Sequence, residues 1–167
     1  MDAKVDNYTY TIIKEKTNLD EKTKLEEISW LPNEQVLLFT GLASVSDTEL
    51  FFVNADGGNL RRLPGSERFD GDAQISPDGT QIVFVSNRDG NDDIYLMNLD
   101  GSGVRRLTNH SAFDVNPAWS PDGQWIVFSS NRGSGLAMNN YDLYVMSTDG
   151  KNQCQLTQGE DTEWEPV

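Results

Sequence analysis

The chain has 167 residues, enough for one domain with a proper core, and 27 acidic residues against 13 basic ones give a formal net charge of −14. A field of this sign repels phosphate backbones and anionic lipids, and no apolar run reaches spanning length, so nucleic acid and membrane insertion are not expected. The single cysteine, Cys154, cannot form an internal disulfide, and we interpret it as an ordinary strand residue.

The N-terminal segment, residues 1–24, is predicted to be one strand followed by a connector. Residues 8–13 alternate in the way a half-buried strand does, and the stretch that begins at Lys14 is rich in charge. The first residues hold no apolar stretch that a signal peptidase could use, so no signal peptide is expected.

An internal repeat dominates the rest of the sequence. Two Ser-Pro-Asp-Gly segments, at 76–79 and 120–123, lie 44 residues apart, and the same offset maps Phe84 onto Phe128. Between the second and third copies the offset grows to 49 in the later half. The five extra residues fall within 133–140, in a lengthened hairpin loop, where insertion costs least. A period of this length indicates a chain of repeated supersecondary units.

Each copy is predicted to hold four short strands. In the third copy the first strand ends at the Pro-Asp-Gly turn at 121–123, and the second, 124–129, is apolar and β-branched. The third surrounds 143–146 and ends at a hairpin turn, and the fourth is the polar 153–157. We therefore predict an all-β fold of three four-stranded antiparallel β-propeller blades, at about 25–69, 70–113 and 114–163.

The first copy and the end of the chain depart from this pattern. Residues 30–34 lack the Asp-Gly pair of the other copies, and Gly41-Leu42-Ala43 replaces Ser-Asn-Arg, so the first blade is degenerate. Residues 163–167 align with 114–118, which predicts that they begin the innermost strand of a fourth blade.

These motifs resemble the repeat of the TolB family of propellers. The third copy matches at Asp114, Pro117, 119–123 and 130–132, and the second matches at Asp70, 76–79, 86–88 and 105–108. The resemblance covers about 25–167 and implies a six-bladed ring of which this chain supplies half. It further implies a role in binding protein partners, and it favours a periplasmic location. The sequence holds no complete catalytic constellation, and no cofactor is predicted.

Three blades do not close a ring, because known propellers need about four or more. Two copies would make six blades, and an open half-ring would expose apolar blade faces, so a homodimer is our preferred interpretation. A fragment of a longer protein and a small four-bladed ring that joins both termini remain the alternatives.

Several residues are candidates for a site at the channel mouth. The repeated acidic positions precede the innermost strands and could bind a partner, or could instead pair with arginines of neighbouring blades. The repetition favours a structural role, since a binding site rarely needs the same residue in each copy. Trp125 and Trp164 are the aromatic candidates for partner contact, whereas Trp30 and Trp119 share one repeat position and are expected to pack between blades. The partner-binding set is thus Asp70, Asp114, Glu163, Trp125 and Trp164, and the structural set is Arg88, Arg132, Trp30, Trp119, Asp78 and Asp122.

Metal and catalytic sites are not predicted. Asp89, Asn91 and Asp93 have the spacing that opens a calcium loop, but the glycine and glutamate of an EF-hand are absent, so they form a weak calcium candidate. His110 is the single histidine and lies in a link between blades, which suits a surface loop better than a catalytic base.

The sequence therefore favours a non-enzymatic scaffold that binds a protein or peptide partner at the channel mouth. The alternative is the propeller portion of a larger enzyme, such as a prolyl-oligopeptidase-type peptidase, whose catalytic domain would lie outside this chain. A third, weaker possibility is a lyase or sugar-binding propeller that uses the channel and a metal.

Overall fold

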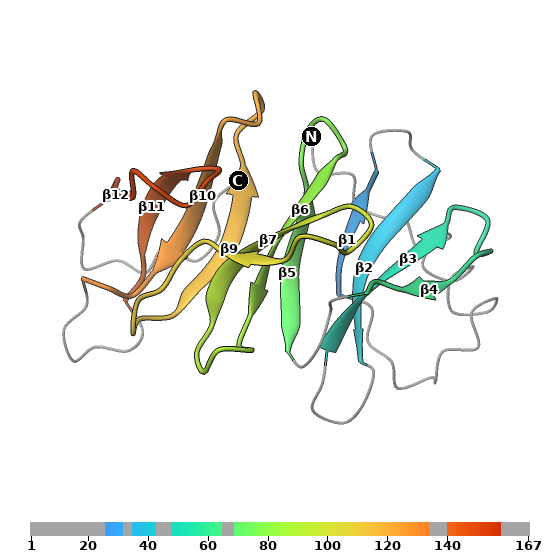
Figure 1. The fold of residues 1–167 in the computed structure, drawn as a ribbon, viewed down its shortest axis with the longest axis horizontal. Helices are drawn as coiled ribbons and strands as arrows, with labels where there is room; N and C mark the ends of the chain where they lie inside the picture. The colour runs from blue at the N-terminus through green and yellow to red at the C-terminus, as the bar shows by residue number, and fades with distance from the viewer. Residues whose placement is uncertain (1–25, 32–34, 43–47, 65–68, 134–139, 158–167) are drawn as a thin grey trace.

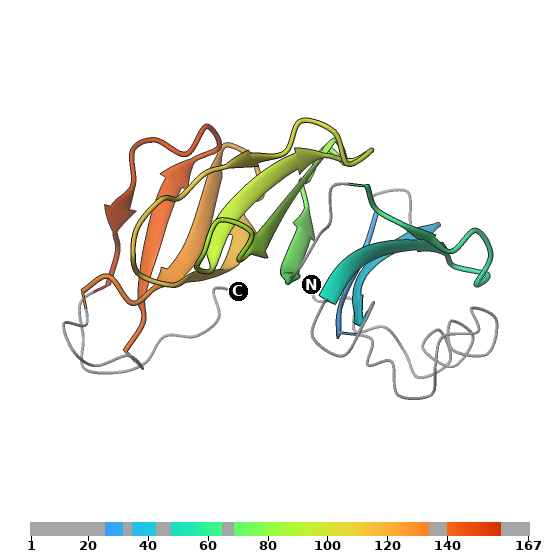
Figure 2. The ribbon, with the colours of Figure 1, turned by 60° about the horizontal axis from the view of Figure 1, so that its bottom comes forward.

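The computed structural model describes residues 26–31, 35–42, 48–64, 69–133 and 140–157. Within them the chain forms three four-stranded antiparallel sheets, each built from four consecutive strands, and Figures 1 and 2 show the second sheet between the other two. The strands are β1 (Glu26–Trp30), β2 (Val36–Leu42), β3 (Thr48–Asn54), β4 (Arg61–Arg62), β5 (Asp70–Ile75), β6 (Gln81–Ser86), β7 (Asp93–Asn98), β8 (Arg105–Arg106), β9 (Asp114–Trp119), β10 (Trp125–Ser130), β11 (Asp142–Ser147) and β12 (Cys154–Gln155).

The predicted all-β fold of three propeller-like blades is confirmed. The first copy, whose motifs are degenerate, still forms a complete sheet in the order β1-β2-β3-β4. The N-terminal segment 1–24 and the start of a fourth inner strand lie outside the described residues. In the part of the chain that the structure describes, no helix is long and apolar enough to cross a membrane.

The strand registers show which residues of the three sheets are equivalent. Leu38 pairs with Phe52 in the first sheet as Val83 pairs with Leu96 in the second, so β2 is offset from β6 by 45 residues, one more than the general repeat. This register makes Phe39, Phe84 and Phe128 equivalent. Each lies beside an aromatic ring of the next strand, Phe51, Tyr95 and Tyr144, with ring centroids 5.5, 5.8 and 5.7 Å apart.

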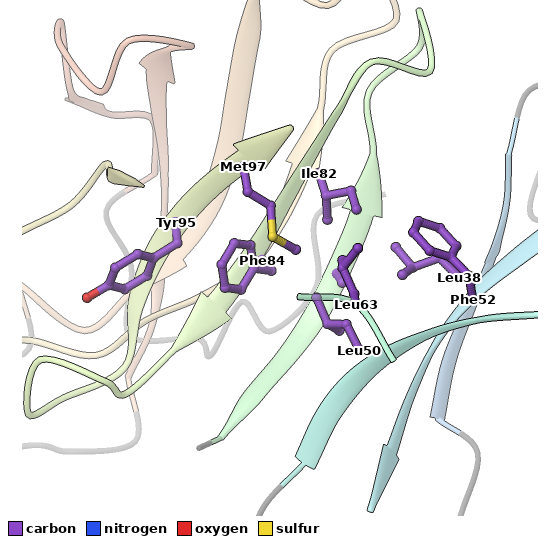
Figure 3. Close-up of a cluster of buried hydrophobic side chains, with 9 residues drawn as sticks. Leu38, Leu50, Phe52, Leu63, Ile82, Phe84, Tyr95 and Met97 are labelled. Carbon is purple, nitrogen blue, oxygen red and sulfur yellow. The ribbon is translucent and has the colours of Figure 1, made fainter. Parts of the chain in front are cut away.

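Each sheet has two apolar faces, because successive strand residues point to opposite sides. We call the face that packs on the following sheet the forward face and the one that packs on the preceding sheet the rear face. Figure 3 shows the first such contact, in which the forward face of the first sheet meets the rear face of the second. Its fully or almost fully buried members are Leu38, Leu50, Phe52 and Leu63 from the first sheet and Ala73, Ile82, Phe84, Tyr95 and Met97 from the second.

The second contact repeats the first one blade further along. The forward face of the second sheet packs on the rear face of the third, again with side chains that are at most 7% exposed. The middle strand β6 is therefore buried on both sides, which explains why 82–85 reads as a continuous apolar run. The second sheet contributes Val83, Val85, Ile94, Leu96 and Leu107, and the third contributes Ile126, Phe128, Tyr144 and Met146.

Bulges in the first strands of the second and third sheets, β5 and β9, bring these two sheets into contact. The registers of β5 and β9 shift within the strand, and the residues at the bulges, Asp72 and Asn116, have positive φ of 49° and 50°. Aspartate and asparagine tolerate this left-handed conformation better than most residues do. The backbone N–H of Asn116 donates to Asp72 Oδ2 at 3.1 Å, so the second and third sheets are joined at their inner edge.

The Pro-Asp-Gly turns between first and second strands are held by the aspartate itself. Asp122 accepts the Ser120 hydroxyl at 2.6 Å and the Gln124 backbone N–H at 3.0 Å, and Asp78 is bonded in the same way by Ser76 and Thr80. Both hydrogen bonds lower the pKa of each of these carboxyls below the usual 3.8, and the bond from the serine hydroxyl has the larger effect. These are the turn positions expected of Asp78 and Asp122 from the repeat.

The fold should lose stability in acid partly through these turns. Because the pKa of Asp122 is lower in the folded state than in the unfolded state, its contribution is complete above 3.8 and is lost as pH falls through the lowered value. The urea midpoint of the wild type should fall between neutral pH and about pH 3. We expect this fall to be smaller in Asp122→Asn. Ser120→Ala, which removes the main donor, should change the drop in the same direction, and an unchanged drop in both variants would contradict this account.

Candidate functional site

The end of each sheet at which its first strand begins carries the repeated acidic residues. We call this end the loop face; it comprises 69–70, 87–93, 109–114, 131–133 and 140–142. Asp70 and Asp114 are fully buried there, although the sequence made them candidates for partner contact. A carboxylate without exposed surface cannot touch a partner unless the loop face opens.

Both buried carboxylates pair with arginines of their own sheet. Arg88 Nη2 lies 3.0 Å from each oxygen of Asp70, and Arg132 bonds Asp114 through Nε at 3.2 Å and Nη2 at 2.6 Å. The sequence had suggested an arginine of a neighbouring blade. The pairing lies within one sheet because Asp70 is opposite Ser86 in the strand register, and Arg88 follows Ser86 by two residues.

The two arginines also cover the aromatic pairs of their sheets. The Arg88 guanidinium carbon lies 5.3 Å from the centre of the Phe84 ring and 5.0 Å from that of Tyr95. Arg132 repeats this geometry over Phe128 and Tyr144 at 5.2 and 5.1 Å. Each arginine therefore joins the first strand, the second and the third, and it seals the apolar layer beneath it.

A second repeated pair, which the sequence analysis missed, joins the third and fourth strands. Arg62 Nε lies 2.6 Å from Glu49 Oε2, Arg106 pairs with Asp93, and Gln155 Nε2 donates to Asp142 at 3.0 Å. The offsets of 44 and 49 already relate these positions. The signal was obscured because glutamate and glutamine replace the usual residues in the first and third sheets.

The weak calcium candidate is not gathered into one site. Asp89 Oδ2 accepts the Tyr95 hydroxyl at 2.6 Å, whereas Asn91 donates to the carbonyl oxygens of His110 and Ala112 at 2.9 and 2.8 Å. Asp93 is bonded to Arg106 and to Thr108. The pKa of the Tyr95 phenol is raised mainly by burial and also by its hydrogen bond to Asp89. Among the described residues no cluster of three or more histidine, cysteine or acidic side chains could hold a metal ion.

His110 lies in the exposed connector between the second and third sheets. Its Nδ1 accepts the backbone N–H of Ala112 at 3.0 Å, so this nitrogen closes a local turn. The surface-loop position expected from the sequence is the one observed.

The tryptophans fall into different environments. Trp119 is half-buried and its indole N–H donates to the carbonyl oxygen of Gln74 in the preceding sheet at 3.3 Å, so it packs between blades as expected. Trp30 is half-buried against the rear face of the first sheet. Trp125 is 42% exposed but begins β10, at the opposite end of the sheet from Asp114. Glu163 and Trp164 lie outside the described residues.

Two exposed phenylalanines are the aromatic groups that the structure adds to the loop face. Phe69 and Phe113 are equivalent, each is 37% exposed, and each directly precedes a buried aspartate. The repeated Phe-Asp pair was visible in the sequence, but the repeat had been aligned from the aspartate onward.

The loop face also carries Asp92, which belongs to neither set of repeated pairs. Burial, and then the nearby charge of Asp72, raise the pKa of Asp92. Burial and the charge of Asp92 raise the pKa of the Tyr141 phenol in the next sheet. The combination of exposed aromatic rings and acidic groups suits a ligand with apolar and basic side chains.

The repeated sheets, their registers and their face-to-face packing define a group of β-propeller blades. Residues 36–166 match the model of the Tricorn protease N-terminal beta propeller domain, and the chain belongs to this family.

Solved propellers show the same arrangement. A TolB protein from Agrobacterium tumefaciens superposes with a TM-score of 0.73 at 23% identity, over 86% of this chain and 50% of its own. TolB from Acinetobacter baumannii gives 0.66 at 25% identity, over 82% and 33%, and puromycin hydrolase gives 0.60 at 20%, over 83% and 23%. The chain thus spans half or less of the length of these structures.

Breaking a buried pair should destabilise the second or the third sheet. Removing one partner of a buried pair leaves an uncompensated charge, so Arg88→Ala should lower the free energy of unfolding by about 3 kcal/mol or more. Urea unfolding at fixed protein concentration would measure this loss. Lys151→Ala is the matched control, because Lys151 and its partner Asp149 are exposed. Should Arg88→Ala fail to fold, Arg88→Lys keeps the charge but loses the Nε bond to Ser86 and the planar guanidinium, and it should give an intermediate loss. Equal stability of all variants would contradict a clamping role.

Proposed function

We propose that the chain is a non-enzymatic β-propeller scaffold that binds a protein or peptide partner at the channel mouth and assembles as a homodimer into a six-bladed ring. The binding role is supported mainly by which side chains are buried and which are exposed on the loop face. Its repeated aspartates are buried and paired, while Phe69 and Phe113 stay exposed on adjacent blades. In this proposal the phenylalanines take the role that the sequence had given to Asp70 and Asp114.

The charge of the chain supports a basic partner. The formal net charge is −14, and Asp92 of the loop face lies near the charge of Asp72. Lysine or arginine side chains of a peptide would be steered to this face, and their apolar neighbours would cover the phenylalanine rings. Exposed aromatic side chains on a rigid frame are typical anchors of such interfaces.

The proposal of a non-enzymatic role is supported by the hydrogen bonds and ion pairs of the side chains that could act as catalytic groups. The Nδ1 atom of His110 is used in a turn, and the buried carboxylates of the loop face are neutralised by arginines. Cys154 is exposed on the outermost strand β12, away from the loop face.

The second candidate function is the propeller portion of a larger enzyme. Two observations favour it: the family is named for a protease, and the fold is similar to that of puromycin hydrolase, of which the chain covers 23%. A reading frame that continues past Val167 into a Gly-x-Ser-x-Gly segment would decide for this candidate.

The partner-binding role can be tested with peptides. A random peptide library selected on the purified chain should enrich sequences that combine basic and apolar residues. The Phe69→Ala/Phe113→Ala double variant should lose most of this binding, since each buried aromatic anchor is worth about 2 kcal/mol or more. Ser111→Ala, an exposed change on the same connector, is the matched control. Absence of enrichment on the wild type, or equal binding by the double variant, would contradict the proposal.

A further inference from the structure

The third sheet holds one buried carboxylate with which no arginine pairs. Among the described residues the carboxylate side chains that are at most 7% exposed are Glu49, Asp70, Asp93, Asp114 and Asp142. The first four each form an ion pair with an arginine of their own sheet. Asp142 is 4% exposed and is bonded instead by the neutral amide of Gln155 at 3.0 Å. The third sheet thus has one paired arginine for two buried carboxylates, whereas the second sheet has two for two.

The Asp142 carboxylate also has an oxygen without a hydrogen bond. Its Oδ1 atom is buried and has no hydrogen-bond partner, whereas Oδ1 of the equivalent Asp93 accepts the Thr108 hydroxyl at 3.2 Å. Burying a carboxylate is costly unless it is paired and hydrogen-bonded. A cation beside Asp142 would therefore stabilise the charged form and supply the missing donor.

Gln155 occupies the place that an arginine fills in the other two sheets. It is opposite Tyr144 in the strand register, as Arg106 is opposite Tyr95. A glutamine side chain is shorter than an arginine side chain and carries no charge, so it donates one hydrogen bond without balancing the carboxylate. Because Gln155 is half-buried, its side chain is reached from the surface.

An exposed glycine adjoins this pair. A Cβ atom on Gly133 would lie 3.1 Å from Asp142 Oδ2 and 3.5 Å from Gln155 Nε2. The second sheet has Asp89 at the equivalent position, 44 residues earlier. Smaller groups therefore flank the carboxylate in the third sheet, with glycine in place of aspartate and glutamine in place of arginine.

The turn that carries Gly133 also holds one exposed ring of the loop face. The backbone N–H of Phe113 donates to Asn131 Oδ1 at 2.9 Å, and Gly133 follows Asn131 by two residues. Phe113 and Asp142 thus both adjoin the turn at 131–133. One peptide segment can place an apolar side chain on Phe113 and a neighbouring basic side chain at Asp142.

We infer that Asp142 binds the guanidinium group of an arginine from the partner. This group displaces the Gln155 amide and takes the place that Arg106 fills within the second sheet. Arginine suits the site better than lysine, because its planar fork of donors bonds both oxygens of a carboxylate. The inference rests on the proposed binding role of the loop face and names the side chain that the partner inserts there.

Asp142 is suited to this role where Asp70 and Asp114 are not. Those two carboxylates are fully buried and are held by charged guanidinium groups, which a ligand would have to displace. At Asp142 the ligand replaces one neutral hydrogen bond with charge-assisted ones, which are about twice as strong. The exchange therefore favours the bound state.

A magnetic resonance titration with Nα-acetyl-arginine amide gives the first test. The backbone amide signals of Gly133 and Leu143 should shift and saturate, because these residues adjoin the Asp142 carboxylate. The uncharged isostere Nα-acetyl-citrulline amide should cause no saturable shift, and Asp142→Asn should abolish the response to the arginine compound. Absence of a saturable shift with the arginine compound, or an equal shift with the citrulline compound, would contradict the inference.

An arginine supplied by the chain itself should fill the site. Gln155→Arg restores the residue of the second sheet, so it should raise the urea midpoint and abolish the shift caused by Nα-acetyl-arginine amide. Gln124→Arg is the matched control, because Gln124 is exposed at the other end of the third sheet, and it should alter neither property. If Gln155→Arg binds the arginine compound as the wild type does, the inference is wrong.

The peptides selected on the loop face separate this inference from the role on which it rests. They should contain arginine, and Gln155→Arg should weaken their binding on the order of 10-fold or more. Peptides that depend on Phe69 and Phe113 but bind Gln155→Arg equally would overturn the arginine site and leave the partner-binding role intact. A wild type that binds the arginine compound at Asp142 but enriches no peptide would do the reverse.

Discussion

The structure depends on one constraint: a four-stranded sheet in this chain has two apolar faces, and the sheet is stable only when these faces are largely covered. A single blade cannot bury both faces by itself, and this is why repeat architectures need several units. The second sheet shows the constraint fully satisfied, since its central strand β6 is buried on both sides. The rear face of the first sheet is buried as well, since Leu37, Phe39 and Val53 are 0% exposed. The forward face of the third sheet differs, because Trp125 and Leu156 stay exposed there.

The buried ion pairs act within this packing and do not replace it. Asp70 with Arg88, and Asp114 with Arg132, tie the first strand of a sheet to the end of its second strand. Each guanidinium also lies over the aromatic pair that forms the rear face. A buried pair of this kind adds little net stability compared with apolar residues of the same size, but it penalises any arrangement that leaves one charge alone. Its repetition therefore fixes the geometry of each blade.

The functional proposal follows from what this arrangement leaves at the surface. Because the repeated aspartates are paired inside their sheets, the proposed partner contact is made by the residues beside them. Phe69 and Phe113 lie on a frame held rigid by the strands that follow them, and the acidic character of the chain surrounds them. A separate apolar patch, formed by Trp125, Val127, Leu143, Val145 and Leu156, lies on the forward face of the third sheet.

The sequence by itself determined the number of blades, the four strands in each and the turns between them. Ser-Pro-Asp-Gly segments and alternating apolar residues are local signals, and turn geometry and strand formation depend mainly on local chemistry. It also placed Trp119 between blades and His110 in a surface connector. Only the tertiary structure decided how the charged residues pair. Whether Asp70 reaches an arginine of its own sheet or of a neighbour depends on strand register, which the offset between copies leaves open. The 45-residue offset of β2 and the pairing of Glu49 with Arg62 were likewise settled by register, because a shift of one residue turns every side chain of a strand to the opposite face.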